Sequence, residues 1–464
     1  MKKILLLCLL ALPCGHLLLA SHLRCGYIIA ERSNCTSRTV KIKIVVFTNT
    51  ASDVKFGEDG ILYFGDGTSI VVPRVENTPR PDLGANIGMA SYTVNHLYGS
   101  LDSYLISYVE PNRNGGVLNM EDSFWTTFYT ETRINLAIGT CSSPVFLSPP
   151  VFFSALQGSE FKISLGTASH DDNLITYEMA VPYRDRGLPV VGYTQPGGMS
   201  VNNLTGVLTW NIENQTQAGE YTFAVIAKQW AKVDDQYRLI GFSRIDFQVI
   251  LNSNASEIPM LDDNQELDEY SRILVQPTEE KKIKVFYEVD SDRNPILEMF
   301  SELDNESVSF TTYDSAAPTG DIKVGVLTII PQEADVRENA YLITVRGRLN
   351  GGPSSPASVS DINYVIYTDE IPEFPFIVDP VTATEREIAE IEVFPNPVQE
   401  QVNIEVNRPG ESEALLYTAQ GVFVKTKTFE LTTSLILTDL PSGVYICEIR
   451  RNNIIVKRIK IIKD

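Results

Sequence analysis

Val393-Phe394-Pro395-Asn396-Pro397 opens the last part of this sequence, which closes with a basic run, Ile455–Lys460. Proline fixes φ and lacks the N–H group that a strand ladder needs, so strand pairing is expected to begin only after Pro397. From Val402 to Val406 apolar residues alternate with polar ones, which is the period of a half-buried strand. The stretch therefore predicts a small β-domain with well-marked ends.

Two further patterns complete this predicted domain. Gln420-Gly421 lies between the apolar runs Leu415–Tyr417 and Val422–Val424, which predicts a hairpin turn because glycine accepts positive φ. Val444–Ile449 follows Leu440-Pro441-Ser442-Gly443 and is apolar on both faces, as a central strand is. Nothing in this region resembles a catalytic cluster, and we expect residues 392–464 to form a compact, non-enzymatic unit.

These motifs, in this order, resemble the type A C-terminal sorting domain of the type IX secretion system of Bacteroidetes. The matching sequences are Phe-Pro-Asn-Pro, the turn glycine, Leu-Pro-Ser-Gly-Val-Tyr and the lysine-bearing last strand. The residues that carry the resemblance are Pro395, Asn396, Pro397, Gly421, Pro441, Gly443, Tyr445, Lys457 and Lys460. Thr418 and Val422 depart from the family pattern, which often has an Asp before the turn and a basic residue after its glycine.

The resemblance implies that this domain is a signal for export. It implies export across the outer membrane, with the secretion machinery and its sorting-domain peptidase as partners, and a protein that is secreted or displayed at the cell surface. Residues 376–391 are rich in charged and small residues after a proline-bearing stretch, which predicts an exposed linker. Removal of the sorting domain is expected in this linker.

The chain begins with the pattern of a secretory signal peptide over residues 1–20. Lys2 and Lys3 precede an apolar run, and Ala20 offers a small residue before the expected cut. A membrane anchor is disfavoured because Pro13 and Gly15 interrupt the run, and a lipoprotein signal at Cys14 is disfavoured by the preceding proline. No later stretch is long and apolar enough to span a bilayer, so we expect no transmembrane segment in the mature chain.

Composition predicts an all-β protein of several domains. The 464 residues include 20 tyrosines and 25 prolines, and frequent Val, Ile and Thr argue for strands joined by tight turns. The net charge is −21, and residues 391–464 hold as many acidic as basic residues, so the acidic excess lies upstream. Such a charge disfavours nucleic acid as a partner. We expect tandem Ig-like β-sandwiches at 21–145, 146–252 and 253–375, ahead of the sorting domain.

Four cysteines follow the signal peptide: Cys25, Cys35, Cys141 and Cys447. An exported protein reaches an oxidising environment that permits disulfides. Cys25 could pair with Cys35, Cys141 could pair with either, and buried free thiols are an equal alternative. The spacing does not suggest a zinc site.

The segment 21–145 contains Tyr63-Phe64-Gly65-Asp66-Gly67-Thr68 and, later, His96-Leu97-Tyr98, a combination that resembles PKD-like Ig domains. We interpret His96 as a hydrogen-bonded structural histidine and Asp66 as a turn residue, because no Ser or Cys motif accompanies them. Pro111–Gly116 resembles N-terminal modules of large Bacteroidetes surface proteins. Both resemblances imply an extracellular module.

The segments 146–252 and 253–375 look like two copies of one design. Gly206-Val-Leu-Thr-Trp210 precedes Tyr221–Val225, and about 119 residues later Gly325-Val-Leu-Thr-Ile329 precedes Tyr341–Val345. Strand, turn and strand at these spacings suit the back half of a β-sandwich. The first copy resembles cadherin-like or putative Ig modules of bacterial surface proteins, and the second is a divergent repeat.

The openings of the two copies carry the candidate metal ligands, which are Asp171, Asp172, Asn173, Asp290 and Asp292. Calcium prefers hard oxygen ligands and takes six to eight of them. These residues supply part of such a shell, so a structural calcium that stiffens a domain junction is one hypothesis and a solvated acidic loop is the other. No other cofactor is expected.

The function expected from these features is structural or adhesive, with an extracellular glycan or surface protein as the ligand. Trp210 lies in a strand motif and is expected in the core, whereas Trp230 is the more plausible exposed aromatic. No known catalytic motif is present, and we expect no enzyme activity. The alternatives are an accessory module for polysaccharide capture and, less favoured, a hydrolase whose site the sequence does not reveal.

Overall fold

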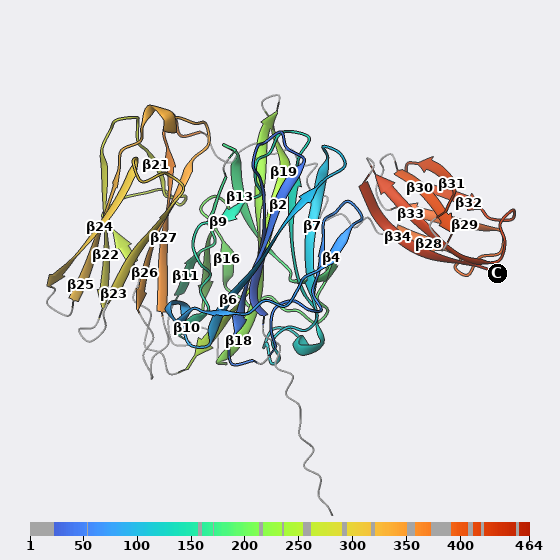
Figure 1. The fold of residues 1–464 in the computed structure, drawn as a ribbon, viewed down its shortest axis with the longest axis horizontal. Coiled ribbons are helices and arrows are strands. Elements are labelled where there is room, and N and C mark those ends of the chain that lie inside the picture. The colour runs from blue at the N-terminus through green and yellow to red at the C-terminus, as the bar shows by residue number, and fades with distance from the viewer. Residues whose placement is uncertain are drawn as a thin grey trace, which may run out of the picture. The chain divides into compact units, whose positions relative to one another are not determined.

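The computed structural model describes residues 23–52, 54–155, 160–169, 171–212, 217–233, 236–253, 261–289, 295–316, 321–349, 358–372, 391–406, 412–418, 422–451 and 454–464. The chain divides into two compact units, Met1–Ile377 and Val378–Asp464. The described residues form strands and three single-turn 3-10 helices, with no α-helix among them (Figure 1). The prediction of an all-β fold is confirmed. The expected signal peptide at 1–20 lies outside the described residues.

The first unit is built around a 12-stranded sheet whose main path runs β4-β3-β7-β8-β19-β1-β2-β6-β5. Strands β10, β13 and β18 also pair into this sheet. Its strands are β1 (Leu23–Arg32), β2 (Thr39–Asn49), β3 (Ile61–Tyr63), β4 (Ser69–Val71), β5 (Thr78–Pro79), β6 (Ile87–Leu97), β7 (Ser103–Glu110), β8 (Phe128–Asn135), β10 (Phe153–Ala155), β13 (Leu174–Ala180), β18 (Gly219–Val233) and β19 (Gln236–Asn252). In β2, Lys41 is exposed and its neighbours Val40 and Ile42 are buried, which is the alternation of a half-buried strand.

Strand β19 joins two segments that the sequence suggested as separate domains. It pairs with β18 along its length, and it also pairs antiparallel with β1 and with β8. Cys25 lies opposite Phe247, and Arg133 lies opposite Phe242. The sheet therefore runs without interruption across the boundary expected at residue 145, and the segments 21–145 and 146–252 share main-chain hydrogen bonds.

The remaining strands of the middle segment lie outside this sheet. They form the sheet β11-β17-β16 and two short pairs, β12-β9 and β14-β15. Their bounds are β9 (Val145–Phe146), β11 (Glu160–Ser164), β12 (Thr167–Ala168), β14 (Tyr183–Asp185), β15 (Leu188–Pro189), β16 (Met199–Val201) and β17 (Val207–Asn211). Trp210 is fully buried and contacts Tyr221 and Phe223 edge-on, so the expectation of a core role for Trp210 is confirmed.

The third segment is a sandwich of two four-stranded sheets, β20-β22-β25-β24 and β21-β27-β26-β23. Its strands are β20 (Leu261–Asp263), β21 (Arg272–Leu274), β22 (Lys281–Val289), β23 (Pro295–Ser301), β24 (Val308–Ala316), β25 (Asp321–Ile329), β26 (Tyr341–Leu349) and β27 (Ser358–Tyr367). Tyr287, Leu327, Val345 and Tyr364 lie in its core.

The middle and third segments share one pattern of strand pairing. Strand β17 pairs with β11 and β16, as β25 pairs with β22 and β24. Strand β18 pairs with β13 and β19, as β26 pairs with β23 and β27. Each copy also has one short parallel pair, β10 with β19 and β21 with β27. The similarity seen in the sequence therefore extends to the topology.

The second unit contains a three-stranded sheet, β28-β29-β32, and a four-stranded sheet, β31-β30-β33-β34. Its strands are β28 (Ile391–Phe394), β29 (Gln401–Val406), β30 (Ser412–Thr418), β31 (Phe423–Phe429), β32 (Thr432–Ile436), β33 (Gly443–Arg451) and β34 (Ile454–Lys463). Strands β30 and β31 form the predicted hairpin, and β33 is the predicted central strand, between β30 and β34.

One expectation about this unit is wrong. Strand pairing does not wait for Pro397, because Ile391–Phe394 already pairs with β29. A proline removes its own N–H and restricts its neighbour, and neither effect prevents the preceding residues from pairing. The prolines therefore end one strand rather than delay the first one.

Candidate functional site

Several of the residues that resemble a sorting signal lie beside the last part of β34. The side chain of Asn396 donates from Nδ2 to the carbonyl oxygen of Lys460 at 2.7 Å and accepts at Oδ1 from the amide of Ile462 at 2.9 Å. Two residues later, Val398 donates to the carbonyl of Ile462 at 2.8 Å, and Asp464 donates to the carbonyl of Val398 at 3.0 Å. The Pro-Asn-Pro segment is thus fastened along the outer edge of β34.

The second motif lies on the other side of β34, at the start of β33. Gly443 pairs with Lys463, and Tyr445 pairs with Ile461. Tyr445 is buried, and its hydroxyl donates to the carbonyl oxygen of Pro441 at 2.8 Å, which closes the turn that leads into the strand. Two motifs about fifty residues apart in the sequence therefore meet on opposite sides of the same strand.

The structure describes some of the other residues that carry the resemblance to a sorting domain. Pro395, Pro397 and Lys460 are exposed. Gly421 lies outside the described residues. Lys457 is part of β34, where it pairs with Ile449.

Comparison with family models agrees with this geometry. Residues 392–464 match the model described as the secretion system C-terminal sorting domain. The chain ends in a type IX secretion sorting domain. Residues 143–238 match the putative Ig domain model, so this sorting-domain protein carries an Ig-like domain upstream of its tail, as predicted. A tail of this kind implies export to the cell surface or the medium.

The other comparisons add little. A comparison with curated proteins gave no significant match. Among solved structures, the chain is similar to one described as the crystal structure of Dpr2 Ig1-Ig2 in complex with DIP-Theta Ig1-Ig3. The identity is 12%, the match covers 72% of this chain and 94% of that one, and the TM-score is 0.17. The PKD-like and cadherin-like resemblances stay predictions.

Upstream, a loop between β7 and β8 is fastened to the middle segment by a buried arginine. The guanidinium of Arg113 donates to both carboxylate oxygens of Asp246 at 2.7 Å, and both side chains are about 1% exposed. It also donates to the carbonyl oxygens of Thr127 and Tyr183 at 3.0 and 2.9 Å. A bidentate pair of this kind combines strength with fixed orientation, so the loop has little freedom at this point.

A second anchor holds the same loop six residues later. Asn119 donates from Nδ2 to the carbonyl of Thr222 at 2.9 Å and accepts at Oδ1 from the amide of Thr222 at 2.9 Å. It also donates to the carbonyl of Thr194 at 3.1 Å. Val117, Met120 and Val190 form a small hydrophobic cluster beside it. The loop is therefore packed on the middle segment rather than extended into solvent.

This anchored loop presents an exposed tryptophan. The single-turn helix η2 (Ser123–Trp125) lies between the anchors and β8. The side chain of Trp125 is 76% exposed, and its ring contacts the Phe124 ring edge-on at 4.7 Å between centroids. The adjacent residues Glu121 and Asp122 are exposed as well. A fixed loop that carries an exposed indole and two exposed carboxylates is a candidate binding surface.

The exposure of Trp125 was not predicted from the sequence. Trp230 was expected to be exposed, and that expectation is wrong. Trp230 is 4% exposed, and its indole N–H donates to Thr176 Oγ1 at 2.8 Å. It is buried because β18 continues to Val233, so Trp230 lies within a paired strand instead of at its end. A signal for Trp125 existed in the polar residues around it, Glu121-Asp122-Ser123.

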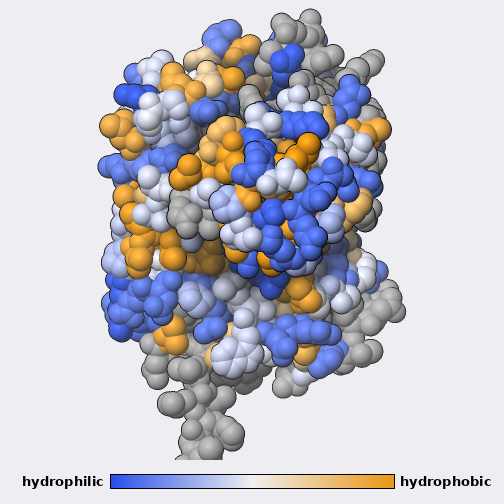
Figure 2. Space-filling view, turned by 90° about the vertical axis from the view of Figure 1, so that its right-hand side faces the viewer, coloured by the Kyte–Doolittle hydropathy of each residue, from blue (hydrophilic) through white to orange (hydrophobic). Residues whose placement is uncertain are grey.

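On the face of the described residues that Figure 2 shows, exposed hydrophobic residues do not form one large apolar patch. In the view of Figure 2, hydrophobic residues occur in groups that are interrupted by hydrophilic ones. Trp125 and Val191 are among the most exposed hydrophobic side chains, with 76% and 72% of their surface accessible. The described part of the chain contains no helix with the length and apolarity of a membrane span.

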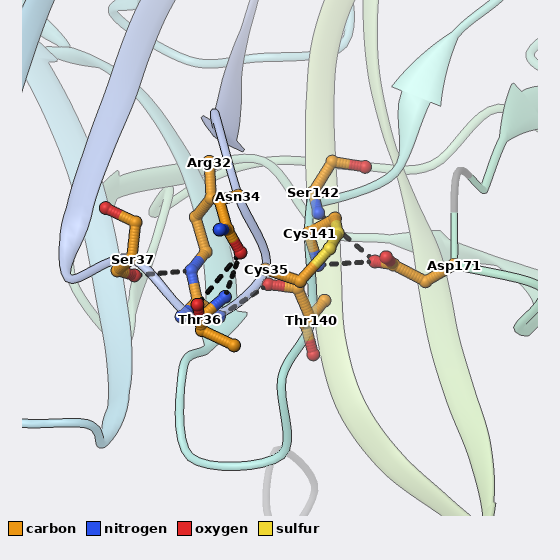
Figure 3. Close-up of a disulfide and its surroundings, with 9 residues drawn as sticks. All are labelled: Arg32, Asn34, Cys35, Thr36, Ser37, Thr140, Cys141, Ser142 and Asp171. Atoms are coloured by element: carbon orange, nitrogen blue, oxygen red, sulfur yellow. Dashed lines mark hydrogen bonds between the residues drawn. A yellow bond between two sulfur atoms is a disulfide. The ribbon is translucent and has the colours of Figure 1, made fainter.

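Asp171, one of the predicted calcium ligands, holds the end of the first segment. Its Oδ2 accepts hydrogen bonds from the amides of Cys141 and Ser142 at 2.8 and 3.1 Å (Figure 3). Cys141 forms a disulfide with Cys35, so of the pairings left open the structure selects this one. Cys25 and Cys447 are buried free thiols, and burial raises the pKa of both.

Asp172, the next predicted ligand, contacts the third segment. Its Oδ1 accepts from the amide of Asn339 at 3.1 Å, and its carbonyl oxygen accepts from Asn339 Nδ2 at 2.9 Å. The guanidinium of Arg337 lies 3.8 Å from the same carboxylate and 2.9 Å from that of Glu302. Glu302 in turn accepts from the amide of Ser169 at 3.1 Å.

Ser169, Asp171 and Asp172 thus connect all three upstream segments through hydrogen bonds. Burial raises the pKa of Glu302, against the opposing effect of Arg337. Asn173 donates its amide to Ser169 Oγ at 3.3 Å. Asp290 and Asp292 lie outside the described residues. Calcium at these five residues stays a prediction.

His96 and Asp66 lie together, as a structural pair would. His96 Nε2 is 2.7 Å from Asp66 Oδ2, and the imidazole stacks on Phe64 at 3.9 Å between centroids. Asp66 Oδ1 accepts from the amide of Thr68 at 2.9 Å, as a turn residue does. Burial raises the pKa of Asp66, but the hydrogen bonds from Thr68 and His96 outweigh it, and the net pKa is lowered.

Proposed function

We propose that this exported protein is a non-enzymatic adhesin whose Ig-like body binds a glycan at Trp125. The observation that carries the proposal is the exposure of this indole on a loop held by Arg113 and Asn119. A rigid aromatic group loses little conformational entropy on binding. The export that the sorting domain implies would bring this surface to the outside of the cell.

A glycan suits the surface better than a protein does. The face of an indole is a flat apolar surface that packs against the C–H groups of a sugar ring. Carboxylate oxygens such as those of Glu121 and Asp122 accept hydrogen bonds from hydroxyl groups. A stable protein interface buries about 800 Å² on each partner, which needs a broader surface than one loop provides.

The carboxylates with a defined environment favour a structural role over hydrolysis. Glu131 accepts from Tyr129 at 2.5 Å and from Arg244 at 3.1 Å, with Glu131 and Arg244 about 3% and 1% exposed. Glu110 accepts from the hydroxyl of Tyr108. A glycosidase needs two carboxylates that reach a substrate. The carboxylates of Glu131 and Glu110 instead accept hydrogen bonds from neighbouring side chains. Polysaccharide capture for a separate enzyme is the alternative role, and it uses the same surface.

The test is glycan binding by the purified full-length protein and by Trp125→Ala. Loss of a stacking contact of about 1.4 kcal/mol weakens binding about tenfold. Tyr313→Ala is the matched control, because Tyr313 is 46% exposed in the third segment. We expect Trp125→Ala to weaken binding to surface polysaccharide and Tyr313→Ala to leave it unchanged. Equal binding by all three proteins would contradict the proposal.

Calcium is a separate proposal for Asp171–Asn173, Asp290 and Asp292. It is supported by the oxygen ligands that these residues offer. The melting temperature in added calcium and in EDTA tests it. A higher melting temperature in calcium that is lost in Asp290→Asn supports the site, and equal melting temperatures contradict it.

A further inference from the structure

We propose that Asn396 is a positioning residue of the sorting domain, whose side-chain amide takes the place of a main-chain peptide group in pairing with β34. On this proposal the secretion machinery recognises the folded surface formed by the Pro-Asn-Pro segment and β34, and it does not contact the Asn396 side chain itself. The inference rests on the identification of residues 392–464 as a sorting domain.

The hydrogen-bond pattern of Asn396 is that of a residue in a parallel ladder. In a parallel pair, one residue donates to and accepts from two residues of the neighbouring strand that flank its opposite number. Asn396 does this with its side chain, donating to the carbonyl of Lys460 and accepting from the amide of Ile462. Its opposite number in β34 is therefore Ile461.

The main chain continues this register without a shift. Val398 donates to the carbonyl of Ile462 and accepts from the amide of Asp464, and it forms a parallel bridge with Lys463. Asn396 and Val398 are two residues apart, as are their opposite residues Ile461 and Lys463. One parallel ladder therefore runs along the edge of β34. Its first pair of hydrogen bonds comes from the side chain of Asn396, and its second pair comes from the main chain of Val398.

The side chain of Asn396 supplies the donor at this point of the edge. Pro395 and Pro397 have no N–H group to donate, and the bond to the carbonyl of Lys460 comes from Asn396 Nδ2 and not from its main-chain N–H. Without this donor, the carbonyl of Lys460 would lack this partner along the outer edge of β34, and an unpaired edge is free to fray or to pair wrongly. An amide side chain offers a donor and an acceptor in the geometry of a peptide group. Of the common side chains only Asn and Gln do so.

The same contacts argue that Asn396 is not itself recognised. Its oxygen and one of its amide hydrogens are engaged with β34, and any partner that took these bonds would have to break the ladder. Pro395, Pro397 and the Lys460 side chain are exposed beside it, and their accessible surface depends on the place of the Pro-Asn-Pro segment. Asn396 therefore acts through the geometry of its neighbours.

Two measurements on Asn396→Ala test the proposal together. One is hydrogen exchange of the Ile462 amide, and the other is the fraction of protein that reaches the cell surface or medium. The expected result is at least tenfold faster exchange of the Ile462 amide and a several-fold drop in export. Asn403→Ala is the matched control, because Asn403 accepts a hydrogen bond from Ser434 at 2.8 Å in the other sheet of the domain. It should change neither quantity.

Three results would overturn the proposal. Lost export with the Ile462 amide still protected would show that Asn396 is read directly. Faster exchange with normal export would show that the ladder is irrelevant to sorting. Equal loss of export in Asn403→Ala would show general destabilisation. Deletion of residues 392–464 tests the export role itself, and it blocks export whether or not Asn396 positions the strand.

Asn396→Asp keeps the test decisive should Asn396→Ala fail to fold. A carboxylate still accepts from the Ile462 amide but cannot donate to the carbonyl of Lys460. We expect this variant to retain part of the protection at Ile462 and part of the export. Full protection with no export would overturn the proposal.

Discussion

Asn339 donates two hydrogen bonds to Asp172, one from its main-chain amide to the carboxylate at 3.1 Å and one from its side chain to the carbonyl oxygen at 2.9 Å. These bonds join the middle and third segments of the chain. Asp172 has φ of 47°, a region that Asn and Asp adopt more readily than other L residues. Both the conformation and the contact favour this residue type.

Substitutions of Asp172 should therefore distinguish the contribution of its backbone conformation to stability from the contribution of its side-chain hydrogen bond. Asp172→Asn keeps the acceptor and the conformational preference, and we expect nearly unchanged stability. Asp172→Ala loses the acceptor and the conformational preference, and it should lower the free energy of unfolding by about 1–3 kcal/mol. Asp172→Gly, which relieves the strain but lacks the acceptor, should fall between them. Thermal unfolding measures this order, and equal damage by Asn and Ala would show that the charge facing Arg337 matters more.

Arg113 should be far more sensitive than a surface arginine. Removing one partner of a buried ion pair leaves the other charge uncompensated, so Arg113→Ala should cost about 3–5 kcal/mol. The matched control is Arg80→Ala, whose bidentate partner Asp82 is 42% exposed, and whose loss should cost about 1 kcal/mol or less. Urea unfolding compares them. Similar costs would refute the role of Arg113 as an anchor.

Reduction of the Cys35–Cys141 disulfide should destabilise the first unit. The bond spans 106 residues of sequence. In the chain-entropy model, a cross-link that closes a loop of that size lowers the entropy of the unfolded chain and so raises the free energy of unfolding by about 4–5 kcal/mol. Unfolding with and without reductant measures the loss. The double variant Cys35→Ser/Cys141→Ser should already be destabilised and should not respond to reductant. A response in that variant would point to another bond.

The Asp66–His96 pair predicts a specific dependence on acid. The pKa of Asp66 is lowered in the folded protein, so the pair contributes stability above the ordinary pKa of Asp, about 3.9, and loses it as pH falls through the folded value. The stability difference between the wild type and Asp66→Asn should therefore shrink below about pH 4. Melting temperatures across pH measure it, and a difference that grows on acidification would contradict the assignment.

Local patterns in the sequence predicted the elements that depend on local chemistry. The hairpin around Gln420, the central strand beginning near Val444 and the core position of Trp210 follow from turn residues and alternation, and all three are confirmed. The pairing of Ile391–Phe394 ahead of Pro395 does not follow from the sequence pattern, because prolines favour an interruption of strand pairing without saying on which side the strand lies.

Long-range pairing was beyond the reach of such patterns. Nothing local to Arg113 indicates that its partner is Asp246, 133 residues away. The insertion of β19 between β1 and β8 is likewise a relation between distant strands, each with an ordinary alternation. The exposure of Trp125 and the burial of Trp230 depend on where strands end after pairing, which the sequence does not state.

The most direct test of the account is localisation of a chain that ends at Glu390. The full-length protein should reach the cell surface or the medium, and the truncated protein should accumulate in the periplasm with its Ig-like body folded. Fractionation of the producing cells, with the Cys35–Cys141 disulfide as a marker of folding, measures both. Normal export of the truncated chain would contradict the role assigned to residues 392–464.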